Sequence, residues 1–129
     1  MSAEENEAIV RYVFEEVNEK NLAFVEEVMA PNFLSHALPP GMPPTRESHK
    51  QALNMLFTAF PDYHVTIEDI IADADKVAAR LTVRGTHQGD FFGIPPIGKQ
   101  VVWAVVDIFR LDEGKFVEYW LIADNLSLL

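Results

Sequence analysis

The sequence contains no cysteine, so neither a disulfide framework nor a cysteine-ligated zinc site is available to it. It is also poor in positive charge, because 10 lysines and arginines stand against 20 aspartates and glutamates, which leaves a formal net charge of −10. Binding to a phosphate backbone requires a basic patch, and this balance opposes it. We therefore expect no nucleic-acid partner.

Long hydrophobic runs are missing as well. The longest wholly apolar run is 101–106 (VVWAVV), and Asp107 ends it. A helix that spans a bilayer needs about 20 such residues. Residues 1–10, MSAEENEAIV, are acidic where a secretory signal peptide is basic. These absences predict a soluble, cytoplasmic protein that has no membrane partner.

Apolar residues are abundant, at 49% of the 129 positions. This length and composition fit a single domain, 1–129, with a sizeable buried core. Up to residue 60 the apolar positions follow the helical period, except in the proline-rich segment 31–44, which we expect to be a stiff loop. Ser2 and Glu5 have the spacing of a capping box. The expected helices are 2–19, about 22–30, and 45–60.

Beyond residue 62 the apolar period changes to two, which is typical of strands with one buried face. Gly85 is a candidate β-bulge, and residues 85–99 form a Gly/Pro-rich excursion between two strands. Three N-terminal helices packed on a curved, mainly antiparallel sheet give an α+β cone, and a pocket is expected at its open end. The expected strands are 63–72, 76–87, 99–111 and 115–126.

Asp124 lies on the last expected strand, where alternation groups it with Glu118, Trp120 and Leu126. If this apolar-looking face is the concave one, burial raises the pKa of Asp124 and makes its carboxylate a candidate general base for a carbon acid. The alternative is structural, with Asp124 capping the strand end or bonding a neighbouring backbone amide.

Asp107 interrupts an otherwise apolar strand, in phase with Trp103. It is either a second cavity carboxylate or the partner of Arg80, Arg84 or Arg110. Buried acids are usually paired, so we expect the arginine pairing.

Histidines are the usual general acids, and four are present. His36, in the proline-rich segment, is placed to overhang the mouth of the cavity. His87 is in phase with the buried side of its strand, and His49 heads the apolar stripe of the third helix. A histidine on an apolar face is more often a core residue than a ligand. The aromatics that could receive a flat hydrophobic ligand, or simply fill the core, include Phe60, Trp103 and Trp120.

Motifs for metals, nucleotides and nucleophilic catalysis are missing. No histidine pair has the HExxH spacing, there is no GxSxG elbow, and the glycines match neither the dinucleotide fingerprint nor the P-loop. We expect no metal site.

Several strings do point to a known group. RGTHQGDFFGIPPIGK (84–99), DIFRLDEGKFVEYWLIADNLSLL (107–129) and AFPDYHVTIEDIIAD (59–73), with His36 after the second helix, resemble the SnoaL-like polyketide cyclases, also called ester cyclases. The resemblance extends over essentially the whole chain. Ile97 departs from it, since the family commonly has a small polar residue there.

The resemblance implies the NTF2-like cone, a homodimer formed through the sheet, and catalysis without a metal or organic cofactor. In such cyclases a pocket aspartate acts as acid and base in an intramolecular aldol closure. The matching position here is Asp124, and the positions that line or border the pocket are His36, Trp103, Trp120 and Glu118.

The leading hypothesis is therefore a cofactor-free acid/base enzyme that acts on a small hydrophobic carbonyl compound. Asp124 and His36 are its predicted catalytic residues. The predicted substrate-binding residues are Trp120, Trp103, Glu118, Phe60 and His87. One alternative is an isomerase or epoxide hydrolase on the same scaffold, and another is a non-catalytic module that binds a hydrophobic ligand or dimerises.

Overall fold

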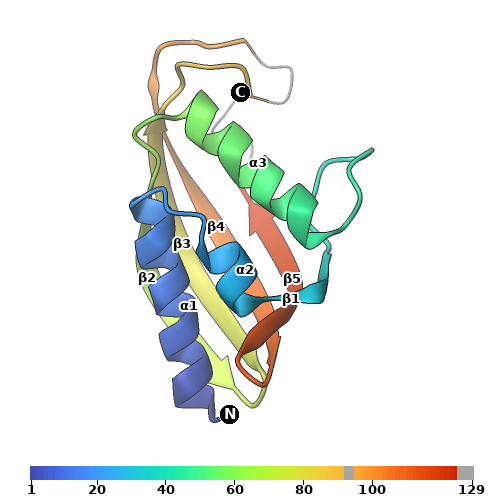
Figure 1. Ribbon diagram of the computed structural model, residues 1–129. Coiled ribbons are helices and arrows are strands. Elements are labelled where there is room, and N and C mark those ends of the chain that lie inside the picture. Colours follow the sequence, from blue (N-terminus) through green and yellow to red (C-terminus); the bar gives the residue numbers. More distant parts are fainter. Residues whose placement is uncertain (92–94, 125–129) are drawn as a thin grey trace.

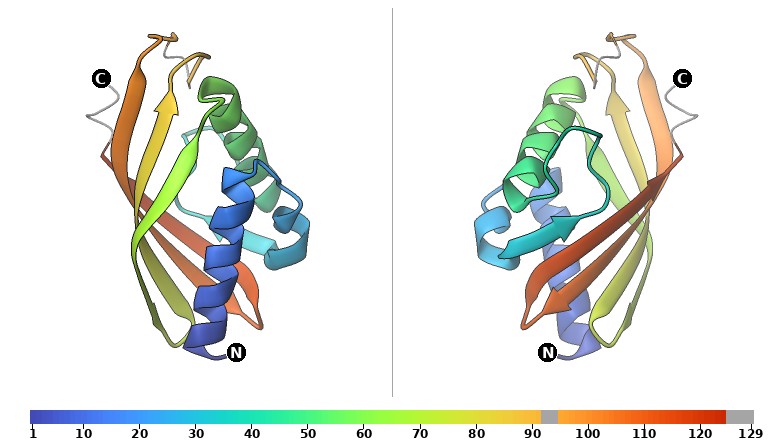
Figure 2. Two further views of the ribbon diagram at one scale, coloured as in Figure 1. Left: turned by 90° about the vertical axis from the view of Figure 1, so that its left-hand side faces the viewer. Right: turned by 90° about the vertical axis from the view of Figure 1, so that its right-hand side faces the viewer.

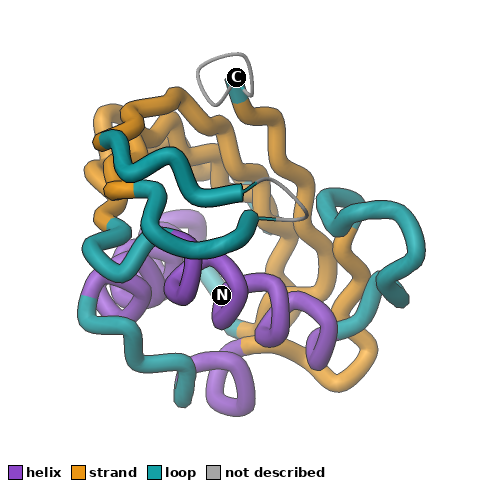
Figure 3. The backbone as a smooth tube through the Cα atoms, turned by 90° about the horizontal axis from the view of Figure 1, so that it is seen from above, coloured by secondary structure: helices purple, strands orange, loops and turns teal. Residues whose placement is uncertain are grey.

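The computed structural model describes residues 1–91 and 95–124. Its helices lie along one face of a curved five-stranded sheet (Figures 1 and 2), and from above they form a layer beside the strands (Figure 3). The strand order is β1-β5-β4-β3-β2, with β1 parallel to β5 and all other neighbours antiparallel. This confirms the predicted α+β architecture. The elements are α1 (Ala3–Asn18), α2 (Phe24–Val28), β1 (Met29–Ser35), α3 (Arg46–Ala59), β2 (His64–Asp73), β3 (Lys76–Thr86), β4 (Gln100–Asp112) and β5 (Lys115–Ala123).

The first helix begins at the predicted capping box. The backbone N–H of Glu5 donates to Ser2 Oγ at 3.1 Å, and the backbone N–H of Ser2 donates to Glu5 Oε1 at 3.0 Å. These bonds satisfy amides that the first turn leaves without helical partners. None of the helices within the described ranges is long and apolar enough to cross a membrane. The apolar stripe that α1 buries consists of Val10, Val13, Phe14 and Val17.

Part of the segment 31–44, expected to be a loop, forms most of the first strand. β1 follows α2 directly and pairs with β5 at the edge of the sheet, so the third helix comes after a strand and the expected order of three N-terminal helices is wrong. Pro31 is tolerated because an edge strand needs ladder hydrogen bonds on one side only. Phe33 and Ser35 alternate inward and are buried.

Gly85 does not form the predicted bulge. It pairs with Val101 in a β3–β4 ladder whose register is regular. The glycine serves packing instead, because a Cβ added there would lie 2.8 Å from the Cβ of Phe60. The absent side chain lets the phenylalanine ring lie directly on the strand.

A bulge that the sequence does not mark lies in β5. Leu111 pairs with Phe116 and Arg110 pairs with Glu118, so Val117 is the extra residue. An extra residue moves every following side chain to the opposite face. Phe116 and Tyr119 are therefore both buried, although they are three positions apart.

Candidate functional site

A cavity of about 460 Å³ lies between the helices and the concave face of the sheet. Its walls are mainly aliphatic and aromatic, and among the described residues no lysine or arginine lines it. A space of this size and character suits a small, mostly apolar molecule. The polar side chains that line it are Ser35, His49, Tyr63, Asp107 and Tyr119.

Asp107 is the one carboxyl among the described lining residues. Strict alternation along β4 turns it inward with Trp103 and Val105, and only 5% of it is exposed. The Tyr119 hydroxyl donates a hydrogen bond to Asp107 Oδ1 at 2.9 Å. Burial raises the pKa of Asp107 from its ordinary value of 3.8 to about 7, and the bond from Tyr119 partly opposes that rise. The carboxyl can therefore both accept and return a proton near neutral pH.

The expected pairing of Asp107 with an arginine is wrong. Arg110 Nε donates to Glu118 Oε1 at 2.9 Å, on the other face of the sheet. Arg84 approaches the Thr66 hydroxyl at 3.5 Å. Asp107 lines the cavity, and this confirms the other role predicted for it, that of a cavity carboxylate.

Tyr119 and Tyr63 are uncharged at neutral pH. Burial raises the pKa of each phenol, and the nearby charge of Asp107 raises it further. His49 is uncharged as well, because burial lowers its pKa to about 4. These three groups therefore stay uncharged in the cavity, as groups removed from water do.

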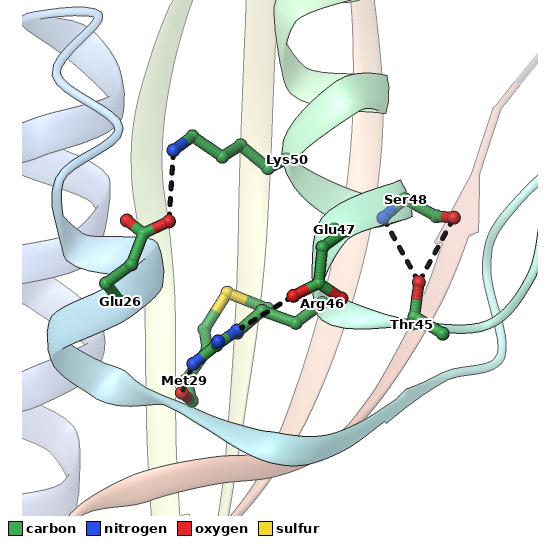
Figure 4. A network of polar contacts seen from close by, with 7 residues as sticks. All are labelled: Glu26, Met29, Thr45, Arg46, Glu47, Ser48 and Lys50. Atoms are coloured by element: carbon green, nitrogen blue, oxygen red, sulfur yellow. Dashed lines mark hydrogen bonds and ion pairs between the residues drawn. The ribbon is translucent and has the colours of Figure 1, made fainter.

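The first turn of α3 is tied to the neighbouring elements (Figure 4). This turn carries the cavity-lining His49. Thr45 caps the helix by accepting a backbone N–H in its first turn at 3.2 Å. Arg46 Nη1 donates to the carbonyl oxygen of Met29 at 3.2 Å, and Lys50 Nζ donates to Glu26 Oε1 at 3.0 Å. These bonds link α3 to β1 and to α2.

Asp124, the predicted base, lies just beyond the end of β5 and is exposed. Its backbone N–H donates to the carbonyl oxygen of Ala104 at 2.9 Å, and it does not line the cavity. The lining residues of this half of β5 are Leu121 and Ala123, whereas Ile122 is 74% exposed. The face predicted to be concave is thus the outer one, because the bulge reverses the phase. A catalytic role for Asp124 stays a prediction.

His36, Glu118 and Trp120 do come together, but away from the cavity lining. His36 Nε2 lies 2.7 Å from Glu118 Oε2, and the imidazole stacks on the Trp120 ring with centroids 5.1 Å apart. Hydrogen bonds from His36 and Arg110 lower the pKa of Glu118. This partly exposed cluster is expected to contribute little to stability and to weaken with salt.

Among the remaining predicted binding residues, Trp103 lines the cavity. Phe60 and His87 lie behind it: the Phe60 ring packs on Trp103 with centroids 5.3 Å apart and on His87 with centroids 5.2 Å apart. Both are almost fully buried. They support the cavity wall without forming its surface.

Three cavity-lining side chains are absent from the site residues predicted from the sequence: Tyr63, Tyr119 and His49. Alternation from Trp103 already turned Asp107 inward, so that signal was present in the sequence. Tyr119 has no such signal, because its orientation depends on the unmarked bulge. Within residues 1–91 and 95–124 there is no group of three histidines or carboxylates that could hold a metal ion.

Comparison with known proteins identifies the family. The SnoaL-like polyketide cyclase family matches residues 8–129 of the chain. The structure resembles AclR of Streptomyces galilaeus, a proposed hydroxylase, with a TM-score of 0.88 and 29% identity over 99% of this chain and 95% of that one. It also resembles IdmH of Streptomyces antibioticus, a proposed polyketide cyclase, with a TM-score of 0.83 and 31% identity over 95% of this chain and 94% of that one.

The name of one curated relative does not mention a polyketide cyclase. The pathogen-related protein of Hordeum vulgare is 34% identical over 103 residues, which cover 72% of this chain and 44% of that protein. The chain therefore spans less than half the length of the curated relative it matches.

Proposed function

Because the chain belongs to the SnoaL-like polyketide cyclase family, we propose that it catalyses cofactor-independent proton transfer at carbon in a small hydrophobic carbonyl compound. The reaction type that fits best is an intramolecular aldol closure, with Asp107 as the acid/base group. The observation that carries the proposal is one buried carboxyl in an apolar cavity, with its pKa raised to about 7. General acid/base groups work best when their pKa lies near the operating pH.

The geometry supports different roles for the two oxygens of the Asp107 carboxyl group. Tyr119 holds Oδ1, and among the described residues no donor bonds Oδ2. Oδ2 of the ionised form removes a proton from the carbon next to a carbonyl group. The enolate carbon then attacks a second carbonyl carbon of the same molecule, and a carbon–carbon bond forms. Asp107 returns the proton to the alkoxide, so the product is an isomer of the substrate.

A test of the base does not require the natural substrate. Solvent deuterium exchange at the carbons next to the carbonyl of 2-tetralone, followed by NMR, reports the proton-removal step alone. We expect the protein to accelerate this exchange, and Asp107→Asn to reduce the acceleration about 10²–10⁴-fold while the protein stays folded by circular dichroism. Asp124→Asn and His36→Phe are the matched controls and should retain it.

The controls separate this proposal from the roles predicted from sequence. If Asp124→Asn removes exchange and Asp107→Asn does not, Asp124 is the base. If the wild-type protein binds 2-tetralone without accelerating exchange, the proposed chemistry is wrong, and a ligand-binding module is the better description.

The outer face of the sheet supports a homodimer. Apolar side chains are exposed on the adjacent strands β4 and β5, with Val102 at 48%, Val106 at 38% and Ile122 at 74% exposure. Exposed apolar clusters of this kind commonly mark protein contacts. Sedimentation equilibrium should give twice the chain mass of 14.6 kDa, and Ile122→Lys should give the monomer mass. A monomeric wild-type protein would refute the dimer.

A further inference from the structure

His49 is a polar group of the cavity that the proposed proton transfer does not use. It lies on the inward side of α3, one turn before Leu53, and lines the cavity with it. Its ring is held edge-on between two aromatic rings, with centroids 5.4 Å from Phe33 and 5.2 Å from Tyr119. Among the described residues no side chain or backbone group forms a hydrogen bond with it. The ring is fixed by packing, and its nitrogens keep their hydrogen-bonding capacity.

The electrostatics of the site determine what such a ring can bind. Burial lowers the pKa of His49 to about 4, so at neutral pH one ring nitrogen carries a proton and the other is an acceptor. Packing alone would not require a histidine here, because Leu53, one turn further along the same side of α3, also lines the cavity. The His49 ring is half-buried and its nitrogens stay accessible, so a ligand oxygen can form a hydrogen bond with them.

Tyr119 connects His49 to the reacting carboxyl. The Tyr119 ring packs against the His49 ring in a T-shaped arrangement, and the Tyr119 hydroxyl donates a hydrogen bond to Asp107. The two groups therefore lie on the same stretch of the cavity wall, separated by one aromatic side chain. A ring-sized ligand that places a carbon at Asp107 can also reach the imidazole.

We propose that His49 is a ligand-binding residue that forms a hydrogen bond with a second oxygen of the ligand, remote from the carbonyl group at which Asp107 acts. The ligand class is an uncharged, mainly apolar ring compound with a carbonyl and a further hydroxyl or carbonyl oxygen. The inference rests on the proposed function only for the position of the reacting carbonyl, since the hydrogen bond at His49 concerns binding.

The test compares the binding of 2-tetralone with that of its 5-, 6-, 7- and 8-hydroxy derivatives by isothermal titration calorimetry at pH 7.5. We expect at least one hydroxy derivative to bind the wild-type protein about 10-fold more tightly than 2-tetralone, as one hydrogen bond in an apolar site allows. His49→Phe keeps an aromatic ring against Phe33 and Tyr119, and it should abolish this preference, so that the hydroxy derivatives bind the variant no more tightly than 2-tetralone does. His49→Gln retains a donor and an acceptor and should restore part of the preference.

The outcomes are distinguishable from those of the proposed function. Equal binding of all five compounds to the wild-type protein, no detectable binding of any, or a preference that survives in His49→Phe overturns the role of His49. A preference that depends on His49, together with unaccelerated deuterium exchange, supports the binding role and refutes the proton-transfer chemistry. Should His49→Phe not fold, His49→Gln and His49→Leu provide the comparison, with the preference retained in the first and lost in the second.

Discussion

Replacing Asp107 with asparagine should stabilise the protein at alkaline pH. Asparagine has nearly the same shape and keeps an oxygen that can accept the Tyr119 hydroxyl hydrogen bond. The folded-state pKa of Asp107, about 7, lies above its ordinary value of 3.8. The folded protein therefore holds a proton that the unfolded chain releases between these two values, and wild-type stability falls as the pH rises through that window.

The magnitude follows from the two pKa values. The difference between 3.8 and about 7 corresponds to about 4 kcal/mol of stability, fully present below pH 4 and lost above pH 7. Asparagine does not ionise, so the variant does not undergo this loss. The free energy of unfolding of Asp107→Asn, relative to wild type, should rise by up to about 4 kcal/mol between pH 4 and pH 8.

Urea unfolding at five pH values from 4 to 8, followed by tryptophan fluorescence, measures this difference by linear extrapolation. Ile71→Ala, at an exposed position on β2, removes no titrating group; it is the control and should differ from wild type by a constant amount. A difference between Asp107→Asn and wild type that does not change with pH would refute the claim that burial of this carboxyl raises its pKa.

Three further substitutions test the surroundings of the site. Tyr119→Phe removes the hydrogen bond that lowers the pKa of Asp107, so the midpoint of the stability loss described above should move to higher pH; a lower midpoint contradicts this. Gly85→Ala places a Cβ 2.8 Å from that of Phe60, and we expect a loss of about 1–3 kcal/mol in urea unfolding, whereas an unchanged midpoint would mean that the strand yields easily. Thr45→Ala removes the N-cap of α3 and should lower the free energy of unfolding by about 1 kcal/mol, while Thr45→Ser should retain most of it in the same assay.

The helices and most strands were predictable because their signals are local. The capping box at Ser2 and Glu5 and the changes of apolar period mark the ends of most elements to within one or two residues. The last strand ends at Ala123, and its predicted end at 126 lies outside the described residues. The strand β1 was missed because its proline is typical of a loop, and only the position at the sheet edge makes Pro31 acceptable. That position depends on distant pairing with β5, which no local pattern contains.

The candidate site also has a part that the sequence predicts and a part that it does not. The inward orientation of Asp107 follows from alternation along an unbroken strand. Its lack of an arginine partner does not, because Arg110 bonds Glu118 on the opposite face. The face of β5 that carries Asp124 was considered as the concave one, and the bulge at Val117 turns it outward. The one extra residue reverses the faces of the seven described residues that follow it.

The bulge in β5 also means that this strand encodes two alternative cavity walls. In the observed register Tyr119 and Leu121 line the cavity, and Glu118 and Trp120 face outward. A β5 paired without an extra residue would exchange these sets and bring a second carboxylate beside Asp107. Two like charges in one apolar space would drive their proton affinities apart. A slip of β5 into regular pairing would therefore change the acid/base character of the cavity without any change of sequence, whereas deleting Val117 would give regular pairing and keep Tyr119 and Leu121 inward.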